Sequence, residues 1–272
     1  MTDKTFKVAA IQMVSGVSVQ DNLSEAGRLI AQATADGARL VVLPEYFCLM
    51  GQHDTDKLAI CEEPGQGPIQ DFLSQQAREH NIWLIGGTLP LRSPDADRIY
   101  NACLAFGPDG NGCGRYDKIH LFGFQRGDED YDESRVIRPG DNAPQVLTLP
   151  CGRVGLSICY DLRFPELFRA WGEVSLLVLP AAFTYTTGSV HWEVLLRARA
   201  IENQCYVLAS AQGGKHENGR RTWGHSMLID PWGESLDCLP EGPGVVSGQL
   251  NQCRIEEVRQ ALPALRHRVM GF

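Results

Sequence analysis

Three residues of this sequence could together carry out chemistry on an amide: Cys159, Glu45 and Lys118. A thiol can attack a carbonyl carbon, a carboxylate can take the proton of that thiol, and a cation can stabilise negative charge on the carbonyl oxygen. Each residue also has an ordinary structural alternative. These are a packing cysteine, an exposed carboxylate after a proline, and a lysine at the edge of an apolar surface.

Each of the three residues comes at or just after the end of a predicted strand. Cys159 follows the apolar run 154–158, and a polar segment with a proline-initiated helix comes next. Glu45 follows the run 40–43 and a proline, and Lys118 lies among apolar and aromatic residues. The carboxyl ends of parallel strands meet at one edge of an open sheet, where ligands bind. We therefore expect the three side chains to lie together, with backbone N–H groups near the thiol available to an oxyanion.

Alternating strand and helix patterns predict an α/β fold. The 272 residues contain no internal repeat, linker or low-complexity tract, so we expect one domain over residues 1–272. The acidic segment 123–140 is rich in turn residues and is expected to be the longest irregular stretch. Strands are expected over residues 6–13, 40–43, 82–86, 99–106, 113–117, 145–149, 154–158, 176–179, 206–211, 226–230 and 245–250, and helices over 21–35, 68–80, 165–171, 191–203 and 255–261.

Composition argues against several classes of function. The net charge is -8 and no Lys/Arg-rich run is present, which disfavours nucleic acid or an anionic membrane as main partner. No stretch approaches the roughly 18–20 apolar residues of a membrane helix, and no leader pattern begins the chain, so a cytoplasmic protein is expected. The nine cysteines form no Cys-x-x-Cys pair, and zinc, Walker and dinucleotide-binding patterns are absent. We expect reduced thiols, no metal site and no cofactor.

Three motifs resemble those of the nitrilase superfamily of carbon–nitrogen hydrolases. They are the Leu-Pro-Glu segment ending at Glu45, the Tyr-Asp-Lys-Ile-His-Leu-Phe segment around Lys118, and the Cys-Tyr-Asp-Leu-Arg-Phe-Pro-Glu segment beginning at Cys159. The resemblance covers nearly the whole chain and implies a four-layer α-β-β-α sandwich that forms homodimers or larger assemblies. Further segments resemble the superfamily as well: 180–184, 191–193, 197–203, 223–226 and 230–233. Among them, 183–184, 191–193 and 230–233 resemble most the branch of deaminated glutathione amidases and omega-amidases.

The resemblance also implies a role for each residue. Cys159 would be the nucleophile that forms a thioester, and Glu45 the general base. Lys118 would hold the oxyanion together with the backbone N–H of Tyr160. The superfamily carries a second glutamate between the lysine and the cysteine, a few residues before a Pro-Gly pair, and Glu133 matches it. Other acids of the same acidic segment compete with Glu133 for that position.

His120 offers a different interpretation of the base, as in the Cys–His pairs of thiol proteases. It lies within the lysine motif, three residues after Asp117. The resemblance favours Glu45 as the base, so we interpret His120 as a structural hydrogen-bonding residue. His191 and His225 receive the same interpretation.

The predicted substrate is a small amide that carries a carboxylate. Arg163 lies four residues after Cys159, and a guanidinium suits bidentate carboxylate binding. An ion pair between Arg163 and Glu166 is an equal alternative, and Arg126 is a second candidate. Further substrate-binding candidates are Tyr160, Phe183, Thr184, Tyr185 and Thr187.

The sequence therefore predicts hydrolysis of such an amide to a carboxylic acid and ammonia, with deaminated glutathione as one candidate substrate. An omega-amidase acting on 2-oxo acid amides is the alternative within the superfamily. Two other classes stay open: an acyltransferase, in which an amine captures the thioester, and a non-catalytic binding protein on the same fold. The presence of all three central residues argues against the non-catalytic class.

Overall fold

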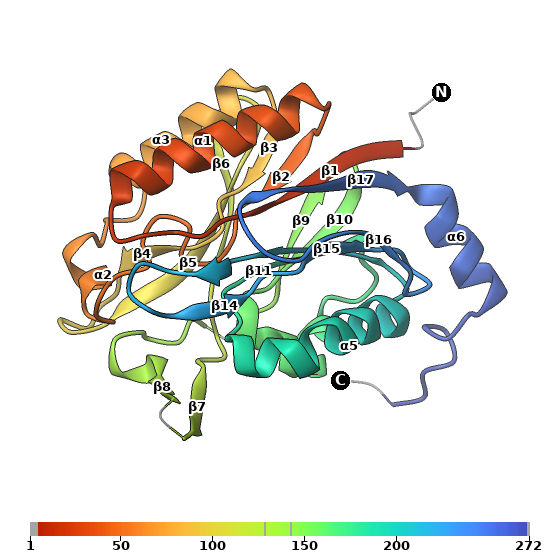
Figure 1. The fold of residues 1–272 in the computed structure, drawn as a ribbon. Coiled ribbons are helices and arrows are strands. Elements are labelled where there is room, and N and C mark those ends of the chain that lie inside the picture. Colours follow the sequence, from red (N-terminus) through yellow and green to blue (C-terminus); the bar gives the residue numbers. More distant parts are fainter. Residues whose placement is uncertain (1–4, 128, 142, 271–272) are drawn as a thin grey trace.

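The computed structural model describes residues 5–127, 129–141 and 143–270. These residues form a four-layer α-β-β-α sandwich, in which two sheets pack face to face and helices cover the outer faces (Figure 1). The predicted fold class is confirmed. The first sheet is covered by α1 (Val19–Ala35) and α3 (Pro68–Glu79), and the second by α4 (Pro165–Ala170) and α5 (Tyr185–Asn203).

Within the described residues, the first sheet has seven strands in the order β17-β1-β2-β3-β5-β4, and β6 pairs with β5. β1, β2 and β3 are parallel to one another, and the remaining pairs are antiparallel. The strands are β1 (Thr5–Gln12), β2 (Leu40–Val42), β3 (Trp83–Ile85), β4 (Leu89–Arg92), β5 (Ile99–Phe106), β6 (Gly112–Asp117) and β17 (Gly244–Asn251).

The second sheet has six strands in the part of the chain that the structure describes, in the order β16-β15-β12-β11-β10-β9. β10, β11 and β12 are parallel. Two hairpins, β7–β8 and β13–β14, lie outside both sheets. The bounds are β9 (Gln145–Leu149), β10 (Gly152–Leu156), β11 (Leu176–Ala181), β12 (Tyr206–Ala211), β15 (Ser226–Ile229), β16 (Ser235–Leu239), β7 (Gly123–Arg126), β8 (Glu129–Asp132), β13 (Gly213–Lys215) and β14 (Arg221–Trp223).

Apolar side chains from both sheets form one core between them. Val8 of β1 and Leu208 of β12 belong to the same buried cluster, and both are fully buried. Gly248 of β17 allows the close approach of the sheets, because a Cβ there would lie 2.5 Å from Leu228 Cδ2. This packing fixes the ends of the strands relative to one another, and the loops at those ends carry the site described below.

Local sequence signals explain most of the elements. Ser18 Oγ caps α1 by accepting a hydrogen bond from Asp21 N at 3.3 Å, and the face that includes Leu29 and Ile30 is buried. The strands predicted over residues 99–106, 145–149 and 206–211 match β5, β9 and β12. The other predicted elements are present with shifted ends, and a last helix, α6 (Gln252–Ala261), follows β17.

Two predictions of local structure were wrong. α5 begins at Tyr185 rather than at residue 191, because Thr184 Oγ1 accepts a hydrogen bond from Thr187 N at 3.3 Å and caps the helix there. The acidic segment 123–140 contains the hairpin β7–β8 and a short 3₁₀ helix, η1 (Glu133–Arg135). The hairpin has polar residues on both faces, so it carries no alternating apolar pattern.

None of the described helices has the length and apolar character needed to cross a membrane. Exposed apolar side chains gather instead along α5 and in the turn before β16. Val190 is 67% exposed, Val194 is 68% exposed and Trp232 is 51% exposed. The two valines lie four residues apart, and therefore on one face of the helix.

Candidate active site

The structure brings Glu45, Lys118 and Cys159 into contact. Glu45 and Lys118 are 0% exposed, and Cys159 is 6% exposed. Lys118 Nζ lies 2.8 Å from Glu45 Oε1, and the Cys159 thiol interacts with the Glu45 carboxylate. β2 and β6, which precede Glu45 and Lys118, belong to the first sheet, and β10 belongs to the second. The expected convergence on one edge of a single sheet was therefore wrong, and the site lies where the two sheets meet.

Four groups hold the Glu45 carboxylate in place. Oε1 accepts hydrogen bonds from Lys118 Nζ and from Asn101 Nδ2, the latter at 3.0 Å. Oε2 accepts a hydrogen bond from Ala182 N at 2.9 Å, and the Cys159 thiol is the fourth partner. Asn101 comes from β5 of the first sheet, and Ala182 follows β11 of the second. Both sheets therefore orient the same carboxylate toward the thiol.

A second carboxylate, Glu133, holds Lys118 from the other side. Glu133 Oε2 lies 2.8 Å from Lys118 Nζ and accepts a hydrogen bond from Phe122 N at 2.7 Å. Glu133 Oε1 accepts a hydrogen bond from Tyr46 OH at 2.6 Å. Among the described acids of segment 123–140, Glu133 is the one that the structure places on the lysine.

Cys159 opens a 3₁₀ turn, η2 (Cys159–Arg163), with a φ of 47°. This left-handed conformation is unfavourable for a residue with a side chain and persists where its surroundings hold it. The buried Asp161 does so: Oδ2 accepts hydrogen bonds from Ile158 N and Tyr116 OH, both at 2.8 Å. His120 Nδ1 lies 2.7 Å from Asp161 Oδ1. The His120 ring therefore hydrogen-bonds to the turn.

Burial and neighbouring charges set the protonation of the site. Burial raises the pKa of the Cys159 thiol well above its ordinary value, and the Glu45 carboxylate raises it further. Burial also raises the pKa of Glu45, against the opposing effect of Lys118. Burial alone would lower the pKa of Lys118, but Glu133 and Glu45 outweigh it and the net change is upward. The thiol therefore keeps its proton at neutral pH and needs a base at the moment of attack.

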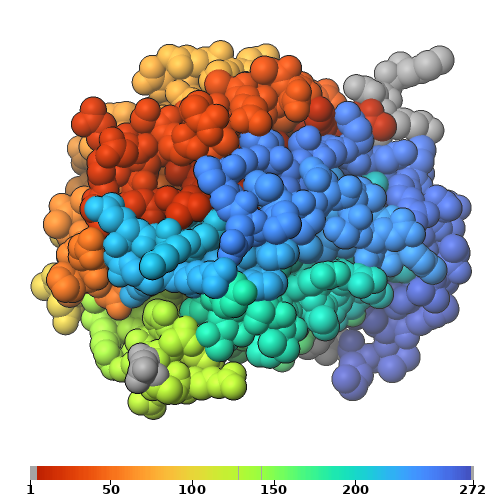
Figure 2. All heavy atoms as spheres, viewed as in Figure 1, coloured from red at the N-terminus to blue at the C-terminus, as the bar shows by residue number. Residues whose placement is uncertain are grey.

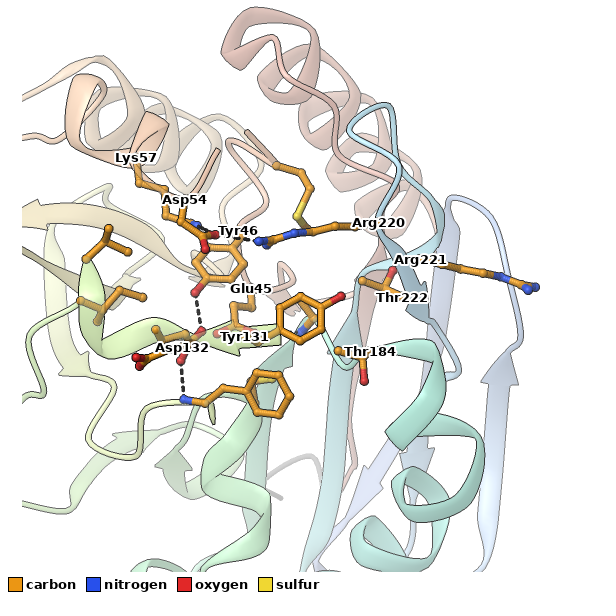
Figure 3. Close-up of a pocket in the computed structure, with 17 residues that line it drawn as sticks. Glu45, Tyr46, Asp54, Lys57, Tyr131, Asp132, Thr184, Arg220, Arg221 and Thr222 are labelled. Atoms are coloured by element: carbon orange, nitrogen blue, oxygen red, sulfur yellow. Dashed lines mark hydrogen bonds and ion pairs between the residues drawn. The ribbon is translucent and has the colours of Figure 1, made fainter. Parts of the chain in front are cut away.

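A cavity of about 60 Å³ reaches this cluster (Figure 3). Cys159, Glu45 and Glu133 line one part of its wall, and Phe122 and Ala182 add apolar surface beside them. A substrate in this cavity meets the thiol and the two carboxylates directly.

The substrate-binding candidates fall into two groups. Tyr160, Phe183, Thr184 and Thr187 line a smaller cavity that also reaches Cys159. Tyr185 lies at the start of α5, where its ring contacts Trp223 at 5.1 Å between centroids.

Arg163 and Arg126 are not among the residues that line either cavity. Arg163 Nη1 lies 3.2 Å from His191 Nδ1, and its guanidinium lies 5.3 Å from the Phe183 ring centroid. Within the described part of the chain, the contacts of the Arg163 guanidinium are with His191 and the rings of Tyr160 and Phe183, and not with Glu166 as the sequence left open. Arg163 therefore lies behind a wall of the smaller cavity, and Arg126 is exposed on β7.

Several polar residues of the cavity were missed by the sequence analysis. Tyr46 follows Glu45, and Asp54, Lys57, Tyr131 and Arg220 line the same cavity (Figure 3). A signal existed for Tyr46, because it adjoins a predicted catalytic residue. Lys57 and Arg220 are far apart in the sequence and come from short elements, so spacing alone could not bring them together.

The described residues include no group of three or more His, Cys, Asp or Glu side chains that could hold a metal ion. The cations at the site are those of Lys118 and of the cavity wall.

Comparisons with known proteins show the family of the chain. The family model for carbon-nitrogen hydrolases matches residues 7–260. A deaminated glutathione amidase from Synechocystis sp. is 42% identical over 271 residues, covering 98% of this chain and 99% of that protein. The mouse omega-amidase NIT2 is 38% identical over 267 residues, covering 97% of this chain and 95% of that protein.

Solved structures give the same result. One is Saccharomyces cerevisiae Nit3, described as a member of branch 10 of the nitrilase superfamily. Its structure matches with a TM-score of 0.87 and 31% identity. The match covers 98% of this chain and 97% of that chain. The Caenorhabditis elegans NitFhit structure also has a TM-score of 0.87, with 36% identity over 99% of this chain. This chain spans 66% of the NitFhit chain.

Proposed function

Because this chain belongs to the carbon-nitrogen hydrolase family and is an enzyme of that class, we propose that it hydrolyses a small carboxylate-bearing amide through a thioester on Cys159. The observation that carries this proposal is the contact of a buried thiol, a buried carboxylate and a buried ammonium at one cavity. Glu45 touches both Cys159 and Lys118, so one carboxylate can serve the nucleophile and be oriented by the cation.

In the first half of the reaction, Cys159 Sγ attacks the amide carbon while Glu45 takes the thiol proton. The carbonyl electrons move to oxygen, and Lys118 Nζ with the backbone N–H of Tyr160 stabilises the oxyanion. When the C=O bond forms again, the C–N bond breaks and Glu45 gives its proton to the leaving nitrogen. The products are a thioester and an amine, which is ammonia for a primary amide.

In the second half, a water oxygen attacks the thioester carbon and Glu45 takes one proton from the water. The C–S bond then breaks, and Glu45 returns the proton to Sγ. The acid is released and the resting thiol and carboxylate are restored. Glu133 keeps Lys118 charged and oriented through both halves, since it binds the ammonium opposite Glu45.

For the substrate, the names of the relatives support two candidates: deaminated glutathione, and the 2-oxo acid amides cleaved by omega-amidases. Both are amides of a carboxylate-bearing acyl chain. The residues of the smaller cavity that would contact such a substrate are Tyr160, Phe183, Thr184 and Thr187, whereas Tyr185 and Arg163 lie outside both cavities. Acyl transfer to an amine uses the same thioester and is distinguished by its product.

We also propose that residues 1–272 act as one domain, in homodimers or larger assemblies, in a reducing compartment such as the cytoplasm. The apolar core shared by the two sheets supports a single domain. Exposed apolar residues along α5 support a homo-oligomer. All nine cysteines carry free thiols, which supports a reducing compartment.

The test is product release from the monoamides of succinic and glutaric acid by the wild type and by Cys159→Ala. The wild type releases ammonia and the matching diacid, and trapping with acid leaves an acyl mass on the Cys159 peptide. Cys159→Ala releases no ammonia while keeping its circular dichroism spectrum. Cys113→Ala, at an exposed cysteine of β6, keeps full activity as the matched control. Substantial ammonia release by folded Cys159→Ala would contradict the proposal.

A further inference from the structure

Three charged side chains at the cavity wall have no part in the chemistry proposed above. Lys57 lies in α2 (Asp56–Ala59), Asp54 lies just before it, and Arg220 lies in the turn between β13 and β14. Arg220 Nη2 lies 2.7 Å from Asp54 Oδ1, and Lys57 Nζ lies 3.5 Å from the same oxygen. All three line the cavity that also reaches Cys159 (Figure 3).

The two cations share a single carboxylate in direct contact, so these three side chains carry an excess positive charge, although the charge of Glu133 also acts on Lys57. The side chain of Lys57 is only 8% exposed. Within the described part of the chain, its ammonium has the long contact with Asp54 and lies 4.6 Å from the Tyr46 ring centroid. An ammonium has three N–H donors, and a buried charge is costly unless these are matched. Lys57 therefore keeps donor capacity inside the cavity.

The cluster is held from both halves of the chain. Asn218 Nδ2 donates to Gly51 O at 2.6 Å, which ties the turn that carries Arg220 to the loop before α2. The Arg220 guanidinium also lies 5.4 Å from the ring centroid of Tyr131 on β8. Figure 2 shows the surface of these segments, where the green hairpin lies beside the teal helix and the pale blue β13–β14 segment. The cations are thus positioned by packing.

We propose that Lys57 and Arg220 form an anion subsite that binds the carboxylate of the amide substrate while its amide lies at Cys159. This inference rests on the proposed function and deepens it by naming the residues that recognise the charge. The guanidinium offers a planar pair of donors and the ammonium a point charge, which together match the two oxygens of a carboxylate. Asp54 is the internal counter-ion of both cations and limits the affinity of the subsite.

The subsite defines a substrate class. An amide with a carboxylate away from the scissile bond gains two charge-assisted contacts, whereas a neutral amide leaves the excess charge of the cluster unmatched. Burial lowers the pKa of Lys57, and a bound carboxylate offsets that cost. The enzyme therefore prefers monoamides of diacids over neutral amides of the same length.

The experiment measures the inhibition constants of succinate and glutarate, used as competitive inhibitors of butanamide hydrolysis. The variants are Lys57→Met, Arg220→Met and Asp54→Asn, with Lys215→Met on the same hairpin as the matched control. Lys57→Met and Arg220→Met raise the inhibition constants about tenfold or more, the loss typical of a charge-assisted contact. Lys215→Met changes neither the inhibition constants nor the kcat for butanamide.

We expect Asp54→Asn to change the inhibition constants in the opposite direction. It removes the internal counter-ion, so both diacids bind more tightly than to the wild type. Equal weakening by Asp54→Asn and Arg220→Met would overturn the proposal, because the cluster would then only support the loops. An increase in the inhibition constant with Arg163→Met alone would also overturn it and assign the carboxylate to Arg163.

Failure of this inference can be separated from failure of the proposed function. Calorimetry of glutarate with Cys159→Ala, Cys159→Ala/Lys57→Met and Cys159→Ala/Arg220→Met needs no turnover. Weaker binding to the two double variants supports the subsite even for an inactive enzyme. Equal glutarate affinity in all three proteins, together with ammonia release by the wild type, overturns the subsite and leaves the hydrolase assignment standing.

Discussion

In the proposed reaction, Glu45 is the residue on which both proton transfers depend. Its two oxygens accept hydrogen bonds from Lys118, Asn101 and the backbone of Ala182, which leaves the thiol of Cys159 as the partner that can exchange a proton with it. A carboxylate fixed in this way needs no reorganisation when the proton moves. The roles of Glu45 and Lys118 therefore belong to the transition state more than to substrate binding.

We expect Glu45→Gln and Lys118→Ala each to lower kcat by about 10²–10³ or more with a much smaller change in KM, because both groups act on charge that develops during the reaction. Steady-state kinetics with glutaramate measures both constants. Glu63→Gln, at an exposed carboxylate paired with Arg92, is the matched control and changes neither. A variant that raised KM while keeping kcat would make that residue a substrate contact.

The fall of kcat/KM at low pH is expected to follow the ionisation of Glu45. The base must be ionised, and burial raises its pKa, so kcat/KM falls as the pH drops through a midpoint above 4.5, the ordinary value for glutamate. Glu133 raises the pKa of Glu45 further by its negative charge. Glu133→Gln removes that charge, and we expect the acid limb to move to lower pH while kcat falls. The pH dependence of kcat/KM checks this, and a limb that stayed in place or moved upward would show that another group controls it.

At the scale of elements, two strained residues stand next to the catalytic groups. Tyr46 has a φ of 56° and Cys159 a φ of 47°. Each comes where the chain leaves a strand of the sandwich and turns sharply, and such strain is retained where function requires the position. The apolar runs before these turns could be predicted from the sequence. The left-handed conformations could not, because neither position carries a glycine or asparagine.

The small elements around the cavity were the ones that sequence patterns missed. α2, β4, β13, β14 and β16 are short, and the hairpin β7–β8 has polar residues on both faces. Their positions depend on tertiary contacts, such as the hydrogen bond from Thr186 Oγ1 of α5 to Glu129 Oε2 of β8 at 2.6 Å. Glu133 was found through the resemblance. Lys57 and Arg220 were not found, since Lys57 lies on the short helix α2 and Arg220 in the turn between β13 and β14.

The contact between α5 and β14 gives a test at this scale. A Cβ at Gly188 of α5 would lie 2.3 Å from Trp223 Cβ, which is too close for any side chain. We expect Gly188→Ala to destabilise the protein by about 1–3 kcal/mol through overpacking, a fall in Tm of about 2–4 °C per kcal/mol. Thermal unfolding measures the shift. Activity falls as well, because Thr184 and Thr187 of the same helix start line the smaller cavity.

Gly112→Ala is the matched control for this change. Gly112 begins β6, is exposed, and has no atom within 4 Å of an added Cβ. The same substitution there leaves Tm nearly unchanged, which separates the steric conflict at Gly188 from the general effect of replacing glycine. Equal stability of the two variants would mean that β14 moves away from α5 without cost.

For the whole molecule, alternating patterns predicted an α/β fold but not how many sheets it contains. Both sheets combine parallel strands with antiparallel neighbours, so nothing in the periodicity assigns β2 and β10 to different sheets. The sandwich was expected from the superfamily motifs, and the structure confirms it. The consequence for function is that Glu45 comes from one sheet and Cys159 from the other, so the packing of the sheets assembles the site.

Exposed apolar side chains gather on one part of the outer surface. Val190 and Val194 of α5 are 67% and 68% exposed, and Ile201 of the same helix and the nearby Trp232 are 48% and 51% exposed. Apolar side chains gathered in this way are typical of an interface, and we propose that a second copy of the chain covers them in a symmetric dimer. We expect the wild type to elute as a dimer and Val194→Asp as a monomer in size-exclusion chromatography with light scattering, because an interface does not accept an unpaired charge.

Ala31→Asp, on the exposed face of α1, stays dimeric as the control. A Val194→Asp variant that remained dimeric would place the interface on another face of the sandwich.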